Sequence, residues 1–267
     1  MSMSKSSSAY LYIFYYHFLT ILAYPYELLI TVIEPAAEIG FLVLFWGMVA
    51  RGSSHPIDLI SMVAYFIMVQ FVSIWSLNPG GLNFSNYIGY RIKSGILSQS
   101  LIRPIRTLPA LLFEHRGYFF VDMIFSVILL ALAIKLLGGI ELNQLVMFIV
   151  FSILSCIITF SLCVLIGSLA FITKEISSIR HSVSHLVRIL SGAMVPLNFF
   201  PEGIRHWLSI TPFPSMVFVP ISVLQNKLPP TVLLFNFKVA LFWSFLLLGA
   251  ALLIWQRNMK KYEANGI

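Results

Sequence analysis

Charged side chains are scarce in this sequence. Only 10% of its 267 residues are Asp, Glu, Lys or Arg, whereas about a quarter is usual in soluble globular proteins. With 59% hydrophobic residues, so small a charged fraction cannot cover the surface of a soluble particle of 30.2 kDa. A soluble globular fold is therefore excluded, and most of the chain is expected to lie within a lipid bilayer.

Other absences narrow the function. The sequence has no Gly-x-x-x-x-Gly-Lys-Ser/Thr loop, so it offers no P-loop for nucleotide phosphates. Because Gly-x-Ser-x-Gly and His-Glu-x-x-His are also missing, no enzymatic activity and no resident cofactor are expected. The only cysteines, Cys156 and Cys163, lie in an apolar run and are expected to be packing residues. The net charge of +7 comes without a groove-reading motif, so a nucleic-acid partner is not expected.

What the sequence does contain is a series of apolar runs, each long enough to cross a hydrocarbon layer about 30 Å thick. They predict an all-α integral membrane fold, a single transmembrane domain over residues 1–267. Six transmembrane helices are predicted, over 28–50, 58–78, 117–137, 143–171, 176–199 and 231–255. The fifth is the weakest of these predictions, because its first half is polar and basic.

The basic residues orient the predicted spans. Most of the 17 Lys and Arg residues lie in the two terminal tails and in loops on the same side as the tails. The positive-inside rule places this side in the cytoplasm, so both termini are expected there, in agreement with an even number of spans. The predicted location is the bacterial inner membrane, where such residues also contact anionic lipid.

Three segments outside the spans are expected to have structure of their own. Residues 9–25 are rich in Tyr and Phe and end at Pro25, which favours a helix in the membrane interface over the alternative, the start of a long first span. Residues 79–116 form a basic cytoplasmic segment. Residues 200–230 hold several prolines between apolar residues, which predicts short re-entrant helices dipping into the outer leaflet.

Two acidic residues lie in the first predicted span. Glu34 and Glu38 are four residues apart and therefore share one helix face. A span that began after Glu38 would be too short to cross, so at least one carboxylate is embedded or lies near the headgroups. Two interpretations stay open: a carboxylate pair that faces a wet cavity or a basic partner, or side chains that reach the headgroups and an ion pair that stabilises the bundle.

A polar stripe begins the fifth predicted span. Ser177, His181, His185 and Arg188 recur at helical spacing, with apolar residues on the opposite side. The stripe is expected either to line the cytoplasmic entrance of a translocation path or simply to lie at headgroup level. A metal site is not expected at His181 and His185, because no set of carboxylates accompanies them.

The cytoplasmic segment carries a family resemblance. Residues 92–105 read IKSGILSQSLIRPI, which resembles the segment "basic, x-Gly-x-Leu … Leu-x-Arg-Pro" of the type-two ATP-binding-cassette (ABC) exporter permeases, in particular their short six-span branch. Further features agree in order: an aromatic helix before the first span, SGAMVPL at 191–197 after the fifth, and WQR at 255–257 after the last. The resemblance covers nearly the whole chain.

The resemblance implies a permease subunit that dimerises, with a copy of itself or a paralogue, and that docks separate ABC ATPase subunits carrying the ATP and Mg²⁺. It implies an export path between the two permeases and cargo that is lipidic, polymeric or amphiphilic. The implied ATPase-coupling residues are Arg91, Lys93, Gly95, Leu97, Arg103 and Pro104. The candidate path residues are Glu34, Glu38, His181, His185 and Arg188.

Two other functions remain open from the sequence. One is an ion- or proton-coupled secondary transporter or channel, with Glu34, Glu38 and Asp122 as relays and no ATPase. The other is a membrane scaffold or integral membrane enzyme. The chain shows no internal repeat, so the inverted-repeat architecture of many secondary transporters has no support.

Overall fold

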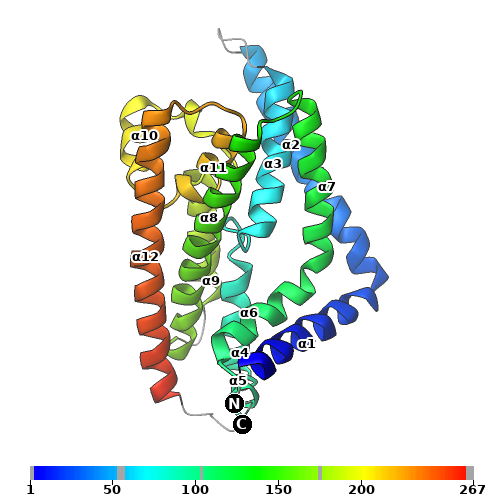
Figure 1. The fold of residues 1–267 in the computed structure, drawn as a ribbon, viewed down its shortest axis with the longest axis vertical. Coiled ribbons are helices and arrows are strands. Elements are labelled where there is room, and N and C mark those ends of the chain that lie inside the picture. The colour runs from blue at the N-terminus through cyan, green and yellow to red at the C-terminus, as the bar shows by residue number, and fades with distance from the viewer. Residues whose placement is uncertain (1–2, 53–57, 103–104, 174–175, 263–267) are drawn as a thin grey trace.

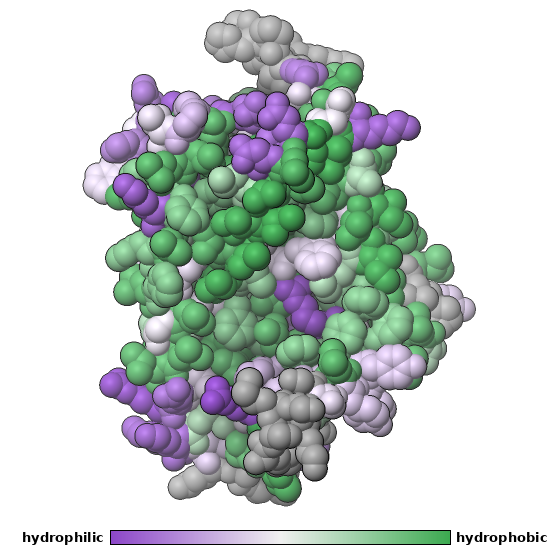
Figure 2. All heavy atoms as spheres, viewed as in Figure 1, coloured by the Kyte–Doolittle hydropathy of each residue, from purple (hydrophilic) through white to green (hydrophobic). Residues whose placement is uncertain are grey.

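The computed structural model describes residues 3–52, 58–102, 105–173 and 176–262, and all of the regular elements in these ranges are helices. The long helices run roughly along the longest axis of the molecule (Figure 1). On the face seen in Figure 2, hydrophobic residues form a broad band around the middle, interrupted by a small hydrophilic spot, while most hydrophilic residues gather towards the two ends. This distribution is the one that a bilayer imposes on an embedded bundle.

The longest apolar helices are α2 (Pro25–Gly52), α8 (Leu142–Ser168) and α12 (Pro230–Lys261). In the described part of the chain these three, with α8 extended by the short helix η1 (Leu169–Phe171), are long and apolar enough to cross a membrane. A fourth crossing results if α6 (Thr107–Tyr118) and α7 (Phe120–Leu136), which meet at a 63° bend, form one broken span. The apolar helix α3 (Leu59–Trp75) is shorter, with 17 residues.

The structure thus confirms an all-helical chain with membrane-length apolar helices, whereas the count of six spans stays a prediction. The largest difference concerns the fifth predicted span, 176–199. Helix α9 there covers only Ser177–Leu190, and the chain turns at Gly192, whose φ of +89° lies in the left-handed region that glycine adopts readily. The hydropathy of residues 176–199 resembles that of one weak span because this range joins a polar helix to an apolar turn.

The long helices form two groups. In the α3 group, α3 packs against both α2 and α7. In the α8 group, α8 packs against α12, α4 (Asn83–Lys93) and α11 (Phe218–Leu224), and α9 contacts α4. Polar contacts join the groups. The Tyr65 hydroxyl donates to the Gly192 carbonyl at 2.7 Å, and the Ser155 hydroxyl lies 2.8 Å from that of Ser76. The two groups therefore meet along a partly polar seam.

The aromatic N-terminal segment forms helix α1 (Met3–Leu22), and α2 begins at Pro25, where the sequence predicts a break. Helix α1 runs obliquely to the bundle in Figure 1. It packs on α6 and the start of α7: the rings of Tyr10 and Phe113 stack at 5.5 Å, and Phe14 meets Phe120 edge-on at 5.1 Å. Its position in the membrane interface stays a prediction.

The segment 200–230 contains α10 (Glu202–Ser209), the short helix η3 (Pro214–Met216) and α11. Helices α10 and α11 lie at the end of the molecule opposite to α4 and the end of α12 (Figure 1). Short helices separated by proline were predicted here, and α11 is buried against α8. Their re-entry into a leaflet stays a prediction.

Helices α4 and α8 approach each other closely at a glycine. A Cβ atom on Gly167 of α8 would lie 2.8 Å from Cβ of Ile88 and 3.2 Å from the Ser85 carbonyl oxygen of α4. Ile88 is fully buried, and neither it nor the helix backbone can move without disturbing the packing. This contact ties the basic segment to the central helix of the α8 group.

We therefore expect Gly167→Ala to destabilise the protein by about 1–3 kcal/mol, the usual effect of overpacking. The measurement is the midpoint of thermal unfolding of the purified protein in detergent. Gly249→Ala in α12 is the matched control, because a Cβ atom there meets nothing within 4 Å. Equal midpoints for the two variants would contradict the close contact between α4 and α8.

Candidate functional site

The basic segment 79–116 folds into α4, α5 (Leu97–Ile102) and α6. These helices lie at the same end of the molecule as the beginning of α1 and the end of α12 (Figure 1). Two of the six candidate ATPase-coupling residues of this segment, Arg103 and Pro104, lie outside the described residues. The other four candidates, Arg91, Lys93, Gly95 and Leu97, can each be placed.

Gly95 and Leu97 set the angle between α4 and α5. Gly95 has a φ of +72°, a conformation that side chains with a Cβ atom rarely adopt, although a Cβ atom would meet nothing within 4 Å. Two residues later, Leu97 is fully buried and anchors the first turn of α5. The turn is therefore fixed by backbone conformation on one side and by packing on the other.

Arg91 points inward. Its Nη2 atom lies 2.7 Å from Oε2 of Glu114 in α6 and donates to the Tyr87 hydroxyl at 2.6 Å, while that hydroxyl donates to Glu114 at 2.8 Å. The Arg91 and Glu114 side chains are 17% and 3% exposed. Burial, together with the Glu114 carboxylate, raises the pKa of the Tyr87 phenol, so this hydroxyl keeps its proton. The three residues clamp α4 to α6.

Lys93 is exposed. Arg106 is exposed as well, and so are the large side chains Tyr90 and Ile102, at 61% and 85%. We call these four exposed residues of the segment, Tyr90, Lys93, Ile102 and Arg106, the end face. Its mixture of basic and apolar groups is typical of a protein-docking surface.

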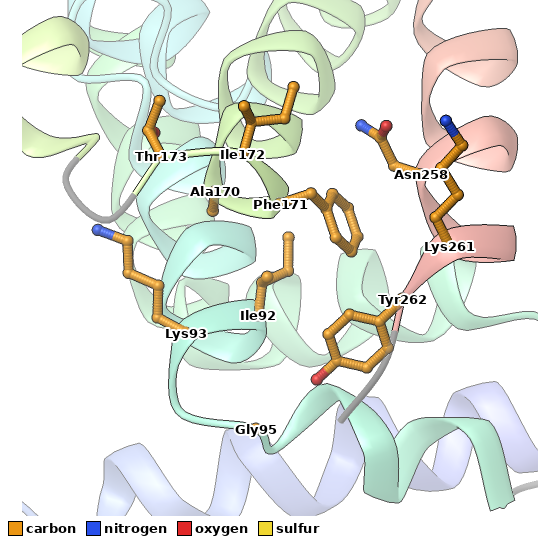
Figure 3. Close-up of a pocket in the computed structure, with 10 residues that line it drawn as sticks. All are labelled: Ile92, Lys93, Gly95, Ala170, Phe171, Ile172, Thr173, Asn258, Lys261 and Tyr262. Atoms are coloured by element: carbon orange, nitrogen blue, oxygen red, sulfur yellow. The ribbon is translucent and has the colours of Figure 1, made fainter. Parts of the chain in front are cut away.

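A cavity of about 730 Å³ opens beside the turn at Gly95 between α4 and α5 (Figure 3). It lies between the α4–α5 turn, the chain after α8 and the end of α12. Phe171 and Tyr262 project into it from two sides, with their rings edge-on at 5.7 Å. Tyr262 also approaches α5, because its hydroxyl lies 3.4 Å from that of Ser98. The cavity thus lies between the α4–α5 turn and the ends of α8 and α12, and Tyr262 reaches across to α5 on one side of it.

The candidate path residues are only partly brought together. Arg188 of α9 forms an ion pair with Glu38 of α2, and Gln70 of α3 donates to the other Glu38 oxygen at 2.8 Å. This pair crosses the seam between the two helix groups. His181 and His185 lie instead on the exposed side of α9, where His181 contacts Arg180 at 2.8 Å. The Arg188 pair fits both open interpretations of Glu38, a basic partner at a path and an ion pair that stabilises the bundle.

Glu34 lines a smaller cavity of about 120 Å³ that also reaches Glu38. This cavity lies between α2, α3 and the α6–α7 bend, and we call it the acidic cavity. Asp122 and Arg116 contribute from the bend. The Arg116 guanidinium donates to the carbonyl oxygens of Ile74 and Trp75, at 2.9 and 2.6 Å, and so satisfies the C-terminal end of α3.

Sequence reasoning did not assign roles to Gln70, Tyr87, Glu114 or Arg116 at these sites. Gln70 had a signal, since it is a polar residue in an otherwise apolar run. For Glu114 and Arg116 the only signal was the charge of the side chain. Nothing in the sequence shows that Glu114 would pair with Arg91, or that Arg116 would bind the end of α3. Their roles depend on the bend between α6 and α7, which has neither proline nor a distinctive motif.

The Glu38–Arg188 pair predicts the outcome of a double-mutant cycle. Glu38→Gln or Arg188→Gln alone leaves one charge without its partner, and we expect each to lower stability by roughly 1–2 kcal/mol, less than for a fully buried pair because both side chains are about one-third exposed. The double variant should recover part of this loss. Thermal unfolding in detergent measures all three variants.

Glu202→Gln, a change of an exposed acid in α10, is the control for the loss of one negative charge. Additive effects of the two single changes would show that the two side chains do not interact.

Residues 57–266 match the sequence model of a family described as ABC-2 family transporter protein. The match confirms the resemblance drawn from residues 92–105 and from the later motifs. It includes α3 to α12, and therefore the basic segment and α9, whereas α1 and α2 precede it. No curated protein is significantly similar to the chain.

Proposed function

The chain belongs to the ABC-2 family of transporter proteins, and on this premise we propose that it is the membrane permease subunit of an ABC exporter. In this proposal the ATPase subunits are separate chains, which hold the ATP and Mg²⁺. The observation that carries the proposal is the construction of the basic segment, in which an end face suited to docking is attached rigidly to the membrane helices.

The end face is the proposed contact with the ATPase. Lys93 and Arg106 supply positive charge and Ile102 supplies apolar area. A push on α5 reaches α4 through the turn at Gly95, and α4 is held to α6 by the Arg91–Glu114 pair and to α8 by the close contact at Gly167. The segment can therefore transmit movement as one body to both helix groups. In this mechanism Arg91 acts inside the segment, while Lys93 faces the partner.

The export path is proposed to lie between two permease subunits, the second being a copy of this chain or a paralogue. Helices α2 and α9 support this, because both leave large apolar side chains exposed, among them Phe41 and Leu44 on α2 and Leu186 on α9. His181 and His185 share the exposed side of α9 and would face the path. A partner placed here would also cover the outer side of the Glu38–Arg188 pair.

The placement in the membrane follows from the same proposal. Docking on a cytoplasmic ATPase puts α4, α5 and both ends of the chain on the inner side of a bacterial inner membrane, and α10 and α11 on the outer side. Six crossings then require α3 and the region of α9 to span with the help of neighbouring helices. The burial of α11 against α8 supports a re-entrant position for the segment 200–230.

Charge reversal on the end face tests the docking. We expect the double variant Lys93→Glu/Arg106→Glu to lose co-purification with its ABC ATPase, because both side chains are exposed and would repel an acidic partner surface. The measurement is the ATPase-to-permease ratio after affinity purification from membranes that contain both chains. Arg205→Glu, an exposed residue of α10 at the other end, is the matched control; an unchanged ratio in the double variant would refute docking at this surface.

The turn at Gly95 tests the transmission of force. Proline fixes φ near −65°, far from the +72° found here, so Gly95→Pro should break the turn and uncouple transport from ATP hydrolysis while the protein still inserts. The measurement is the ratio of cargo exported to ATP hydrolysed in reconstituted vesicles. Gly203→Ala, at an open position of α10, should leave this ratio unchanged, and near-normal transport by Gly95→Pro would count against the coupling segment.

One observation favours the second candidate, a secondary transporter driven by an ion or proton gradient. The acidic cavity gathers Glu34, Glu38 and Asp122, the three proposed relays, on one side of the bundle. Liposomes that contain only this chain separate the two functions. Transport that follows a pH or ion gradient without any ATPase would favour the second candidate.

A further inference from the structure

We propose that the acidic cavity binds the ammonium group of a cationic amphiphile, with the hydrocarbon part of that molecule lying along the lipid-facing surface beside it. The claim that the amphiphile is cargo rests on the proposed export function. The claim that the cavity binds it rests on the cavity alone. Four features of the cavity lead to it: its charge, its depth, an unpartnered buried ring and its size.

The charge of the cavity is negative. Three carboxyl groups, those of Glu34, Glu38 and Asp122, line it together with one guanidinium, that of Arg116. Arg116 is already engaged by the two carbonyl oxygens at the end of α3. Glu38 is paired with Arg188 from outside the cavity, whereas Glu34 has no hydrogen bond or ion pair with any described residue. A cation is therefore the ligand whose charge the cavity complements.

The depth of the cavity makes this charge costly. Glu34 and Glu38 lie within the 18-residue apolar window Val32–Val49 of α2. A carboxylate costs about 2.5–3.5 kcal/mol at the centre of a bilayer on insertion scales, and less towards the end of the window, where Glu34 and Glu38 lie. Snorkelling to the headgroups lowers this cost for a long side chain near a helix end, but Glu34 is directed to a cavity that Asp122 of α7 also lines. A bound ammonium group would offset the charge of Glu34 where it lies.

His115 supplies an independent sign of a ligand. The side chain is 5% exposed and lines the same cavity, yet neither of its ring nitrogens has a hydrogen-bond partner among the described residues. Buried polar groups are nearly always hydrogen-bonded. The ring is held in place by stacking on Phe119 at 4.6 Å, so it is ready to accept a hydrogen bond from an N–H group, and Phe119 offers its own ring to the cavity.

The size of the cavity selects the kind of molecule. About 120 Å³ holds an ammonium group with a few attached carbons, but not a whole amphiphile. The cavity reaches the surface, because Glu34 is exposed and Asp122 half-buried. Beside it, Ile33 of α2 and Ile124 of α7 are 62% and 50% exposed, and in a membrane this surface faces lipid tails. The head of the ligand therefore fits inside, and its chain fits outside.

Electron spin resonance of spin-labelled amphiphiles tests the site without any ATPase. The purified chain is placed in nanodiscs of neutral lipid, and spin-labelled octadecylamine is compared with spin-labelled octadecyl sulfate. We expect the protein to immobilise a larger fraction of the amine than of the sulfate. Each of Glu34→Gln and Asp122→Asn should weaken amine binding about tenfold, the effect of losing one charge-assisted hydrogen bond, and Glu34→Lys should reverse the preference.

Glu202→Gln is the control, because it removes an exposed acid far from the cavity, and its amine binding should equal that of the unmodified chain. Equal immobilisation of amine and sulfate by the unmodified chain would overturn the inference. So would amine binding that survives the combination of Glu34→Gln with Asp122→Asn in protein whose unfolding midpoint shows that it is folded.

A second measurement separates this inference from the exporter proposal. With the ATPase present, octadecylamine should stimulate ATP hydrolysis by the complex and octadecyl sulfate should not. A complex that hydrolyses ATP but shows no preference for the amine in either assay would overturn the inference and leave the exporter proposal standing. Selective amine binding by a chain that recruits no ATPase would overturn the exporter proposal and leave the site.

Discussion

The ion pair between Glu38 and Arg188 is the interaction on which the membrane half of this protein depends. Hydrocarbon offers no partner to a charged group, so each charge on an embedded helix must be satisfied by protein, by water or by reaching the headgroups. Glu38 is satisfied by Arg188 of α9 and by Gln70 of α3 at the same time. One side chain thus joins α2, α3 and α9, and it does so across the seam between the two helix groups. Separation of the groups at this point would leave two opposite charges without their partners, and that cost opposes opening of the seam.

The basic end of the molecule follows a different logic, because water and, in the proposed mechanism, a partner protein are available there. Charges can remain exposed, as those of Lys93 and Arg106 are, and the structure uses other means to make the segment stiff. A buried ion pair with a shared tyrosine hydroxyl clamps α4 to α6, and the glycine of α8 lets α4 come close enough for backbone contact. Stiffness matters because a segment that bent under load would absorb the movement it is proposed to pass on.

Hydropathy located the apolar helices because a span must be long and apolar whatever it packs against, and α2, α8 and α12 satisfy that requirement without help. It overestimated the helix at 176–199, because a polar helix and an apolar turn together resemble one weak span. The polar and charged residues of the sequence predicted that Glu38 and the stripe on α9 are candidates for a functional role. They did not predict that, of the stripe, Arg188 contacts Glu38 while His185 stays on the exposed side. Arg91 shows the same limit. The sequence gives the charge of a side chain, whereas the direction in which it points is decided by contacts between distant residues, here with Glu114.

The two halves of the molecule are connected through the chain that leads into α4. Its backbone is unusually bent, with positive φ at Leu77, Asn78 and Leu82, and it lies against α9. A Cβ atom on Gly80 would come within 2.6 Å of Cγ of Arg188, and the Gly81 carbonyl accepts a hydrogen bond from Arg180 at 3.1 Å. The stem of the Arg188 side chain therefore rests on the base of the segment whose other end meets the proposed ATPase.

If α4 tilts, this base moves with it, and Arg188 is the first membrane side chain to lose its support. Because Arg188 pairs with the Glu38 carboxylate at the edge of the acidic cavity, the same displacement would weaken the seam and leave that carboxylate free within the cavity. In the proposed mechanism, this one loop would therefore connect force applied at the cytoplasmic end to the charge available inside the membrane.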